Sequence, residues 1–106
     1  MVELVSRPLS NLAENDLLEI IGDAFKRLNI RIEDRKNRAL VGTRSPSLFS
    51  WGERVHAMVE STPSGPRILV VASPIVPTNV TGYASANRLA RALVETVEEL
   101  ARLRLA

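Results

Sequence analysis

Two loop-like segments, residues 45–54 and 74–83, carry the side chains best suited to binding chemistry. The first holds the only tryptophan of the chain, Trp51, and Phe49, among serines, a proline and a glycine that favour loops. Apolar side chains in such a loop either fold back and cap the core or form a surface for a partner. Neighbouring arginines would receive an anionic group, so the partner is a protein or a small anionic ligand. The candidate binding residues are Arg44, Phe49, Trp51, Arg54, Asn79 and Tyr83.

A second candidate site is basic and lies near two predicted turns. It consists of Arg35, Lys36, Arg38 and Arg67, and we expect only Asp34 to offset their charge. Clustered cations bind phosphate backbones, so nucleic-acid binding is the alternative function. No aromatic residue lies between these cations, which leaves base stacking without support. The competing explanation is a charged, solvated turn that protects a hairpin from edge-to-edge pairing.

Catalytic and metal-binding patterns are missing from the sequence. The chain has no cysteine, and its one histidine, His56, alternates with the apolar Val55 and Ala57 on a predicted strand. A metal site would then need a cluster of carboxylates, which the predicted strands and loops do not contain. The loop serines have no partnered base, and no glycine-rich phosphate loop is present. We therefore predict a protein that is not an enzyme and that uses no metal and no cofactor.

The composition is typical of one globular domain spanning residues 1–106. Apolar residues make up 45% of the chain and charged residues 25%, and the net charge is a small +2. The absence of cysteine favours a reducing compartment. No apolar run approaches the roughly 20 residues that span a bilayer, and the N-terminus does not resemble a signal peptide. We therefore expect a cytoplasmic protein without a membrane span.

Two segments have the periodicity of amphipathic helices. The first begins near Ser10 or Asn11, which are good N-caps, and ends at Asn29. The second runs over residues 82–105 and carries ion pairs at helical spacing on its solvated side. The apolar stripes expected to face the core are Leu17, Ile21, Ala24 and Leu28 in the first helix and Leu89, Leu93, Val97 and Leu100 in the second.

The segments between the helices predict strands. Residues 30–34 and 39–43 form a hairpin around a tight turn at Lys36 and Asn37. Residues 55–60 alternate in polarity, and the apolar residues 67–73 predict an interior strand. A weaker pattern at residues 2–6 would add a further strand. The predicted fold is an α+β two-layer sandwich in the order (β)-α-β-β-β-β-α, an antiparallel meander of four or five strands with both helices on one face.

Connectivity places the two candidate loops together. Consecutive strands of a meander run in opposite directions, so residues 45–52 and 74–82 share one end of the sheet, the loop end. The turns at residues 36–37 and 64–65 share the other, the turn end. The longer helix begins at the loop end, where its free backbone N–H groups favour polar or anionic groups.

The length of the second helix predicts a dimer. Residues 82–105 would form a helix about 36 Å long, whereas strands of about seven residues reach only about 23 Å. Roughly two turns would then extend past the sheet with three leucines exposed, at a cost of about 1.5–3 kcal/mol each. A twofold dimer would cover them, although Val2, Leu4 and Val5 could cover them within one chain. The predicted dimer contacts are Leu100, Leu103 and Leu105.

The run Ser50-Trp51-Gly52-Glu53 at the start of a strand, followed by Ser73-Pro74 and an asparagine-bearing last helix, resembles a known pattern. It is similar to small uncharacterised prokaryotic α+β domains with a Ser-Trp-Gly-Glu signature. The resemblance covers roughly residues 30–90. The connection over residues 74–82 departs from those domains because it is more apolar. The resemblance implies the fold and carries no activity.

Overall fold

The computed structural model describes residues 2–9, 12–44, 52–75 and 80–105. These residues form an antiparallel sheet of five strands and two helices. The elements in chain order are β1 (Val2–Val5), α1 (Glu14–Arg27), β2 (Ile30–Lys36), β3 (Ala39–Arg44), β4 (Glu53–Thr62), β5 (Gly65–Pro74) and α2 (Val80–Leu105).

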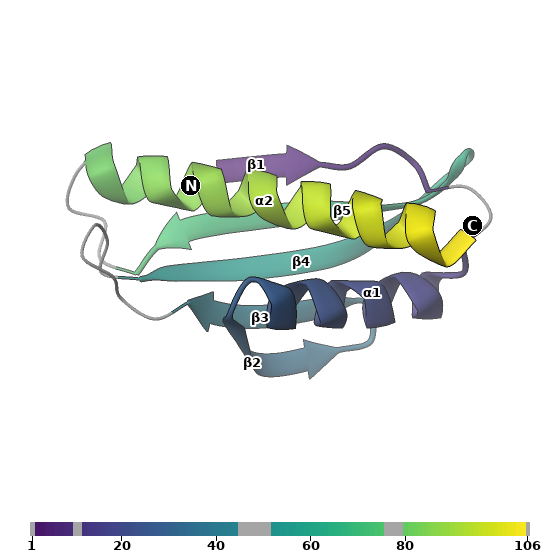
Figure 1. The fold of residues 1–106 in the computed structure, drawn as a ribbon, viewed down its shortest axis with the longest axis horizontal. Coiled ribbons are helices and arrows are strands. Elements are labelled where there is room, and N and C mark those ends of the chain that lie inside the picture. Colours follow the sequence, from purple (N-terminus) through teal and green to yellow (C-terminus); the bar gives the residue numbers. More distant parts are fainter. Residues whose placement is uncertain (1, 10–11, 45–51, 76–79, 106) are drawn as a thin grey trace.

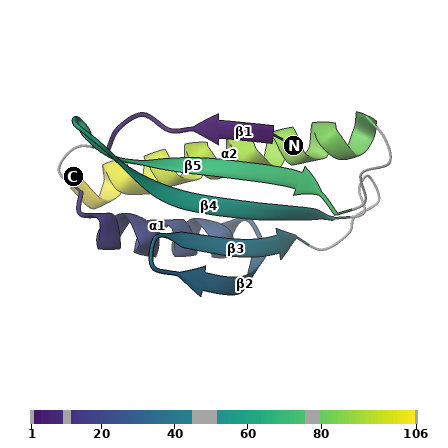
Figure 2. The same ribbon diagram turned by 180° about the vertical axis from the view of Figure 1, so that it is seen from behind.

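The sheet has the strand order β1-β5-β4-β3-β2, so β2 to β5 form the predicted meander. The N-terminal strand is confirmed as the fifth, because Val2 pairs with Ala72 and Val5 with Leu69 on β5. Both helices pack on one face of the sheet (Figure 1). Seen from behind, the opposite face carries neither helix (Figure 2). The α+β two-layer prediction is therefore confirmed, and we call this second side the open face.

The core lies between the sheet and the helices because the strands alternate in polarity. Inward residues of β4 and β5 are almost fully buried, whereas their neighbours are half-buried or exposed. Gly42 on β3 faces inward beneath α1, where a Cβ atom would lie 2.6 Å from the carbonyl oxygen of Arg31. The largest wholly buried apolar side chains are Phe25, Leu17, Ile21, Leu40, Ile68, Leu89, Leu93, Val55, Val70 and Val97.

The start of α1 differs from the prediction. The helix begins at Glu14 with Ala13 at its N-cap, and no side chain caps it. The predicted caps, Ser10 and Asn11, lie outside the described residues. The backbone N–H of Leu9 donates to the carbonyl oxygen of Pro66 at 2.7 Å, so the chain still follows β5 at this point and turns into the helix only later. Asn29 follows the helix end, as predicted, in the left-handed region at φ 59°.

A bulge in β2 reverses which side chains face the helices. The pairing of β2 with β3 shifts between Ile32 and Asp34. Arg35 consequently lies opposite the buried Leu40, and Lys36 lies opposite Ala39. Because neighbouring residues of a strand point to opposite faces, Arg35 is on the helix side and Lys36 is on the open face.

The predicted overhang of α2 past the sheet is wrong. Strands β4 and β5 have ten residues each rather than seven, so they span about 33 Å beneath a helix of about 39 Å. Leu100 packs against the core, and Arg104 joins the end of α2 to Glu19 of α1 at 3.2 Å. Leu103 is 57% exposed, and the side chain of Leu105 lies outside the described residues. The length of α2 relative to the strands therefore does not indicate a dimer at this helix end.

The N-terminal residues add a strand to the sheet, which was one form of the alternative explanation, while Leu103 stays exposed. Val2 and Leu4 of β1 pack against the core cluster, and β1 lies beside α2. Among the described residues, no helix is both long enough and apolar enough to cross a membrane.

Candidate binding site at the loop end

A buried ion pair stands at the loop end of the sheet. Glu53 is the first residue of β4 and is wholly buried, and its register partner is Arg44, the last residue of β3. Arg44 donates from Nε to Oε2 of Glu53 at 3.2 Å and from Nη2 to Oε1 at 2.7 Å. This two-point geometry aligns the planar guanidinium with the carboxylate, which is the stronger form of an arginine–carboxylate contact.

Ser85 extends this pair to the long helix. Its hydroxyl donates to Oε1 of Glu53 and accepts a hydrogen bond from Nη2 of Arg44 at 3.3 Å. Ser85 is only 4% exposed, so the whole contact lies beneath the first turns of α2. The three side chains, which we call the buried triad, join β3, β4 and α2.

The described ends of the two candidate loops also meet at this place. The backbone N–H of Ile75, just after β5, donates to the carbonyl oxygen of Gly52, just before β4, at 3.0 Å. Gly52 has a positive φ of 102°, which an L side chain rarely adopts. Figure 1 shows the chain leaving β3 and β5 at the same end, where α2 starts. The predicted sharing of the loop end is therefore confirmed for the described residues.

The buried triad is suited to positioning rather than to catalysis. Glu53 neutralises the charge of Arg44, and the Ser85 hydroxyl is buried and already hydrogen-bonded. The Arg44 side chain keeps one-third of its surface exposed, and its Nη1 group has no hydrogen bond to any residue that the structure describes. The apolar residue next to the triad, Ile75, is 44% exposed. The described part of the loop end therefore combines a rigid polar base with an exposed apolar side chain.

The sequence pattern indicated Glu53 only as part of the Ser-Trp-Gly-Glu run and not as a candidate binding residue, and it did not indicate Ser85. The signal for Glu53 was present, because it occupies the same alternating positions as Val55 and Ala57, whose side chains face the core. A charged residue at such a position requires a partner within the core. The contact with Ser85, which is 32 residues away in sequence, has no local signal.

The predicted binding residues do not all meet. Arg54 pairs in register with Thr43 and is exposed on the open face, whereas Arg44 faces α2. The two arginines therefore do not converge on one ligand, contrary to the prediction that both receive the same anionic group. Phe49, Trp51, Asn79 and the side chain of Tyr83 lie outside the described residues.

At the turn end, two of the four predicted cations are already paired. Arg38 donates to Oε1 of Glu14 at 2.6 Å and to the Ser61 hydroxyl at 3.0 Å. Arg67 donates to Oε1 of Glu60 at 2.9 Å on the open face. The expectation that Asp34 alone offsets these cations is therefore wrong, since Glu14 and Glu60 approach from elements distant in sequence.

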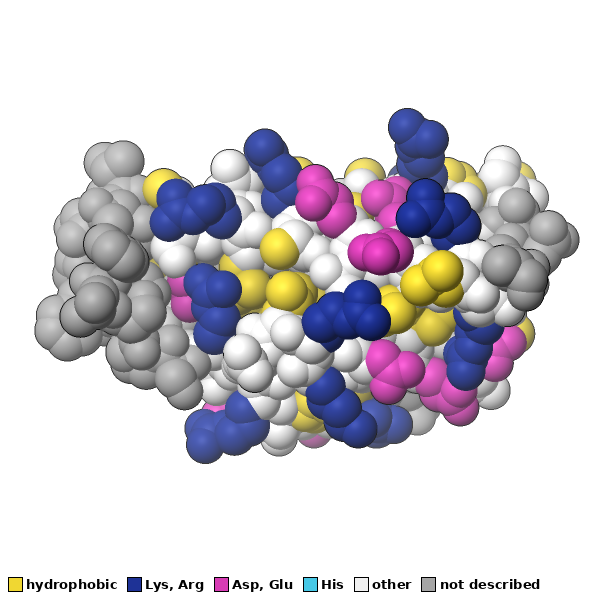
Figure 3. Space-filling view, viewed as in Figure 1, with side chains coloured by type: hydrophobic (Ala, Val, Ile, Leu, Met, Phe, Trp, Pro, Cys, Tyr) yellow, Lys and Arg dark blue, Asp and Glu magenta, His cyan; other side chains and the backbone are white. Residues whose placement is uncertain are grey.

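The remaining two cations are neighbours in β2 and lie on opposite faces of the sheet, with Arg35 beside α1 and Lys36 on the open face. Over the helix side of the molecule, basic and acidic side chains interleave rather than form one basic area (Figure 3). Two of the four predicted cations at the turn end are therefore offset by carboxylates, and the other two lie on opposite faces of the sheet.

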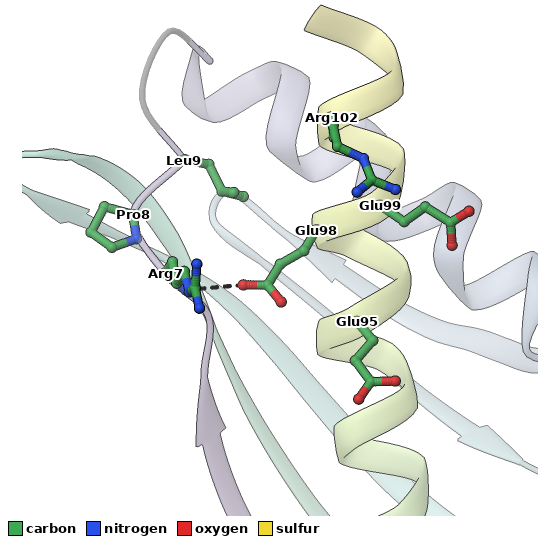
Figure 4. Close-up of a pocket in the computed structure, with 7 residues that line it drawn as sticks. All are labelled: Arg7, Pro8, Leu9, Glu95, Glu98, Glu99 and Arg102. Atoms are coloured by element: carbon green, nitrogen blue, oxygen red, sulfur yellow. Dashed lines mark hydrogen bonds between the residues drawn. The ribbon is translucent and has the colours of Figure 1, made fainter.

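A hollow of about 460 Å³ lies beside the last turns of α2, toward the turn end of the sheet, where Leu9 is hydrogen-bonded to Pro66. Figure 4 shows that the segment following β1 forms one side of this hollow and that the outer surface of α2 forms the other side. The backbone N–H of Arg7 donates across it to Glu98 at 3.3 Å. The lining residues are Arg7, Pro8, Leu9, Glu95, Glu98, Glu99 and Arg102.

The described residues contain no group of three or more potential metal ligands. His56 is exposed on the open face, opposite the buried Val55 and Ala57, as the alternation predicted. No protein-family model matches the chain, and no curated protein matches it. The resemblance to domains with a Ser-Trp-Gly-Glu signature therefore stays a prediction.

Proposed function

We propose that this protein is a non-enzymatic, cytoplasmic binding module whose loops at residues 45–54 and 74–83 receive an apolar segment of a protein partner. The buried triad is the observation that carries the proposal. It fixes the ends of β3 and β4 to the start of α2, and the hydrogen bond from Ile75 to Gly52 joins the two loop bases. The ends of β3, β4 and α2 are thereby held together at the bases of both loops.

A buried ion pair is a costly way to stabilise a fold. Removing two charges from water offsets most of their mutual attraction, and apolar residues of similar volume often stabilise a protein equally well. The triad therefore has little value as a stability device. Its directional hydrogen bonds instead define one arrangement of three elements at the place where both loops begin, and this is what a preformed binding surface requires.

The geometry favours an apolar partner over an anionic ligand. Glu53 neutralises Arg44, and Arg54 lies on the other face, so no pair of free arginines converges at the loop end. The loops themselves contain Phe49 and Trp51. Aromatic side chains of this type dominate the binding energy of many protein interfaces. Nucleic-acid binding at the turn end has less support, because Arg38 and Arg67 already contact carboxylates.

Selection from a displayed library of random peptides tests this proposal. Wild-type protein is the bait, and a Phe49→Ser/Trp51→Ser variant is used to remove peptides that bind elsewhere. We expect apolar, aromatic-rich peptides whose binding changes the fluorescence of Trp51, the only tryptophan of the chain.

The matched control is Leu103→Ser, which removes an exposed apolar side chain from the far end of α2. We expect the selected peptides to bind this variant as tightly as wild type and to lose at least about tenfold in affinity for Phe49→Ser. Recovery of no peptide, or equal binding to the loop variant, would overturn the proposal.

A further inference from the structure

The open face presents apolar side chains that no helix covers (Figure 2). Val5 on β1 is 49% exposed, and the other members are half-buried within the monomer. The described residues form only two layers, and neither helix lies over these side chains. The apolar residues of the open face are Val5, Ala39, Val41, Met58, Leu69 and Val71.

Strand register arranges this face in two rows that run across the sheet. The first row, from β1 to β2, is Val5, Leu69, Met58, Ala39 and Lys36. The second row is Glu3, Val71, His56, Val41 and Asp34. Beyond the first row lie Arg67 and Glu60, and beyond the second lie Ser73, Arg54, Thr43 and Arg31. An apolar centre is therefore flanked by charges of both signs.

Several of these charges have no partner among the residues that the structure describes. Arg54, Lys36 and Asp34 make no hydrogen bond or ion pair with any residue in the described part of the chain, whereas Glu60 pairs with Arg67. A face with an apolar centre and unpaired peripheral charges has the makeup of a protein interface.

We propose that the open face is the interface of a homodimer, in which a second copy packs face to face about a twofold axis running across the strands between the two rows. This axis places the first row of one copy against the second row of the other copy. Leu69 then faces Val71, and Ala39 faces Val41. Lys36 meets Asp34 of the second copy and Arg54 meets Glu60, whereas Glu3 lies opposite Val5 at the edge of the interface. Every contact occurs twice, as twofold symmetry requires.

The alternative twofold axis, parallel to the strands through β4, produces repulsion. It would place Arg54 against its own symmetry copy and Glu3 against Asp34. Direct contact between like charges strongly disfavours such an arrangement, as it does when a protein rejects a wrong partner. Charge pattern therefore selects the axis that crosses the strands.

The area of the open face matches that of a small stable interface. The strands contain 4, 7, 6, 10 and 10 residues and lie about 4.8 Å apart, which gives about 600 Å² for each copy. Two copies would bury about 1,200 Å², the lower limit of standard protein interfaces. Stacked sheets rotate by about 30° relative to one another, so the contacts nearest the axis are the best aligned.

Sedimentation equilibrium at protein concentrations between about 1 and 200 micromolar tests the inference. This range is on the order of the dissociation constants expected of an interface of this size. We expect a monomer–dimer equilibrium with wild-type protein. Lys36→Glu should raise the dissociation constant at least about fivefold, because it turns two attractions into repulsions. The Asp34→Lys/Lys36→Glu variant should restore dimerisation. Met58→Glu, at the centre of the face, should raise the constant at least about a hundredfold.

Two controls isolate the open face. Arg35→Glu makes the same charge change one residue away on the helix side, and it should leave the dimer unchanged. Leu103→Glu should also leave it unchanged, whereas a dimer through the end of α2 would dissociate. Circular dichroism and thermal melting verify that each variant is folded. If Met58→Glu does not fold, the exposed Lys36→Glu and Asp34→Lys/Lys36→Glu variants test the interface in its place. A monomer at 200 micromolar, or a dimer that Lys36→Glu leaves intact, would overturn the inference.

Discussion

The two ends of β3 carry the same three residue types in the same arrangement. At the turn end, Arg38 donates to Glu14 and Ser61, and Ser61 donates to the same carboxylate oxygen of Glu14. At the loop end, Arg44, Glu53 and Ser85 repeat this pattern. The residue types are the same, but Arg44 bonds both carboxylate oxygens of Glu53 whereas Arg38 bonds one oxygen of Glu14, and the burial differs.

Glu53 is wholly buried beside an Arg44 side chain that is 33% exposed, whereas Glu14 and Arg38 remain 40% and 52% exposed. In water the attraction between two unit charges is screened, and ordering two long side chains offsets much of what remains. At the loop end, Glu53 depends on Arg44, because its buried carboxylate is not solvated when the arginine is removed. The same three residue types, arginine, glutamate and serine, therefore form a solvent-exposed contact at the turn end. At the loop end they form a buried contact in which the glutamate requires its arginine.

The largest expected effect is that of Arg44→Met, which leaves the buried carboxylate of Glu53 without its arginine. We expect the free energy of unfolding to fall by about 3–5 kcal/mol. Urea unfolding followed by circular dichroism measures it. A loss of less than about 1 kcal/mol, the median for surface pairs, would show that the loop-end pair behaves like a surface contact.

Ser85→Ala should have an intermediate effect. It removes a hydroxyl that donates to a buried carboxylate, and hydrogen bonds to charged groups contribute about 1.5–3 kcal/mol. The matched control is Ser61→Ala, which removes the equivalent hydroxyl at the exposed turn end, where water replaces it. Equal unfolding free energies for the two variants would contradict the distinction between the ends.

The smallest effect is expected for Arg38→Met. Both members of its pair with Glu14 are exposed, so we expect a loss of at most about 1 kcal/mol. This loss should shrink further in 1 M salt, where the screening length is about 3 Å. A double-mutant cycle with Glu14→Gln at low and high salt isolates the pair. A coupling energy that does not change with salt would contradict the assignment of a screened surface contact.

Most of the fold follows from local patterns in the sequence. Helical spacing located α1 and α2, and alternation placed Val55 and Ala57 on the inner face and His56 on the outer face. The start of α1 could not be located in the same way. Good capping residues at positions 10 and 11 do not determine it, because the chain is still bonded to β5 at Leu9.

The candidate sites depend on contacts between distant segments, which local patterns do not contain. The bulge in β2 inserts one residue after Ile32 and thereby places Arg35 on the helix side and Lys36 on the open face, the reverse of what regular alternation from Ile32 would give. Glu14 lies 24 residues from Arg38, and only the packing of α1 on the sheet brings them together. Strand length mattered as well, because ten-residue strands support α2 along most of its length and remove the predicted overhang.

We infer that the buried triad positions the two proposed binding loops and adds little to stability. The most direct test replaces its charged pair with apolar residues, in an Arg44→Met/Glu53→Leu variant, and measures binding of a loop-selected peptide by Trp51 fluorescence. We expect an unfolding free energy within about 1 kcal/mol of wild type or higher, because the cost of burying two charges is removed. We also expect the peptide dissociation constant to rise at least about tenfold, because the loop bases lose their directional support. A stably folded variant that binds the peptide as tightly as wild type would contradict the claim.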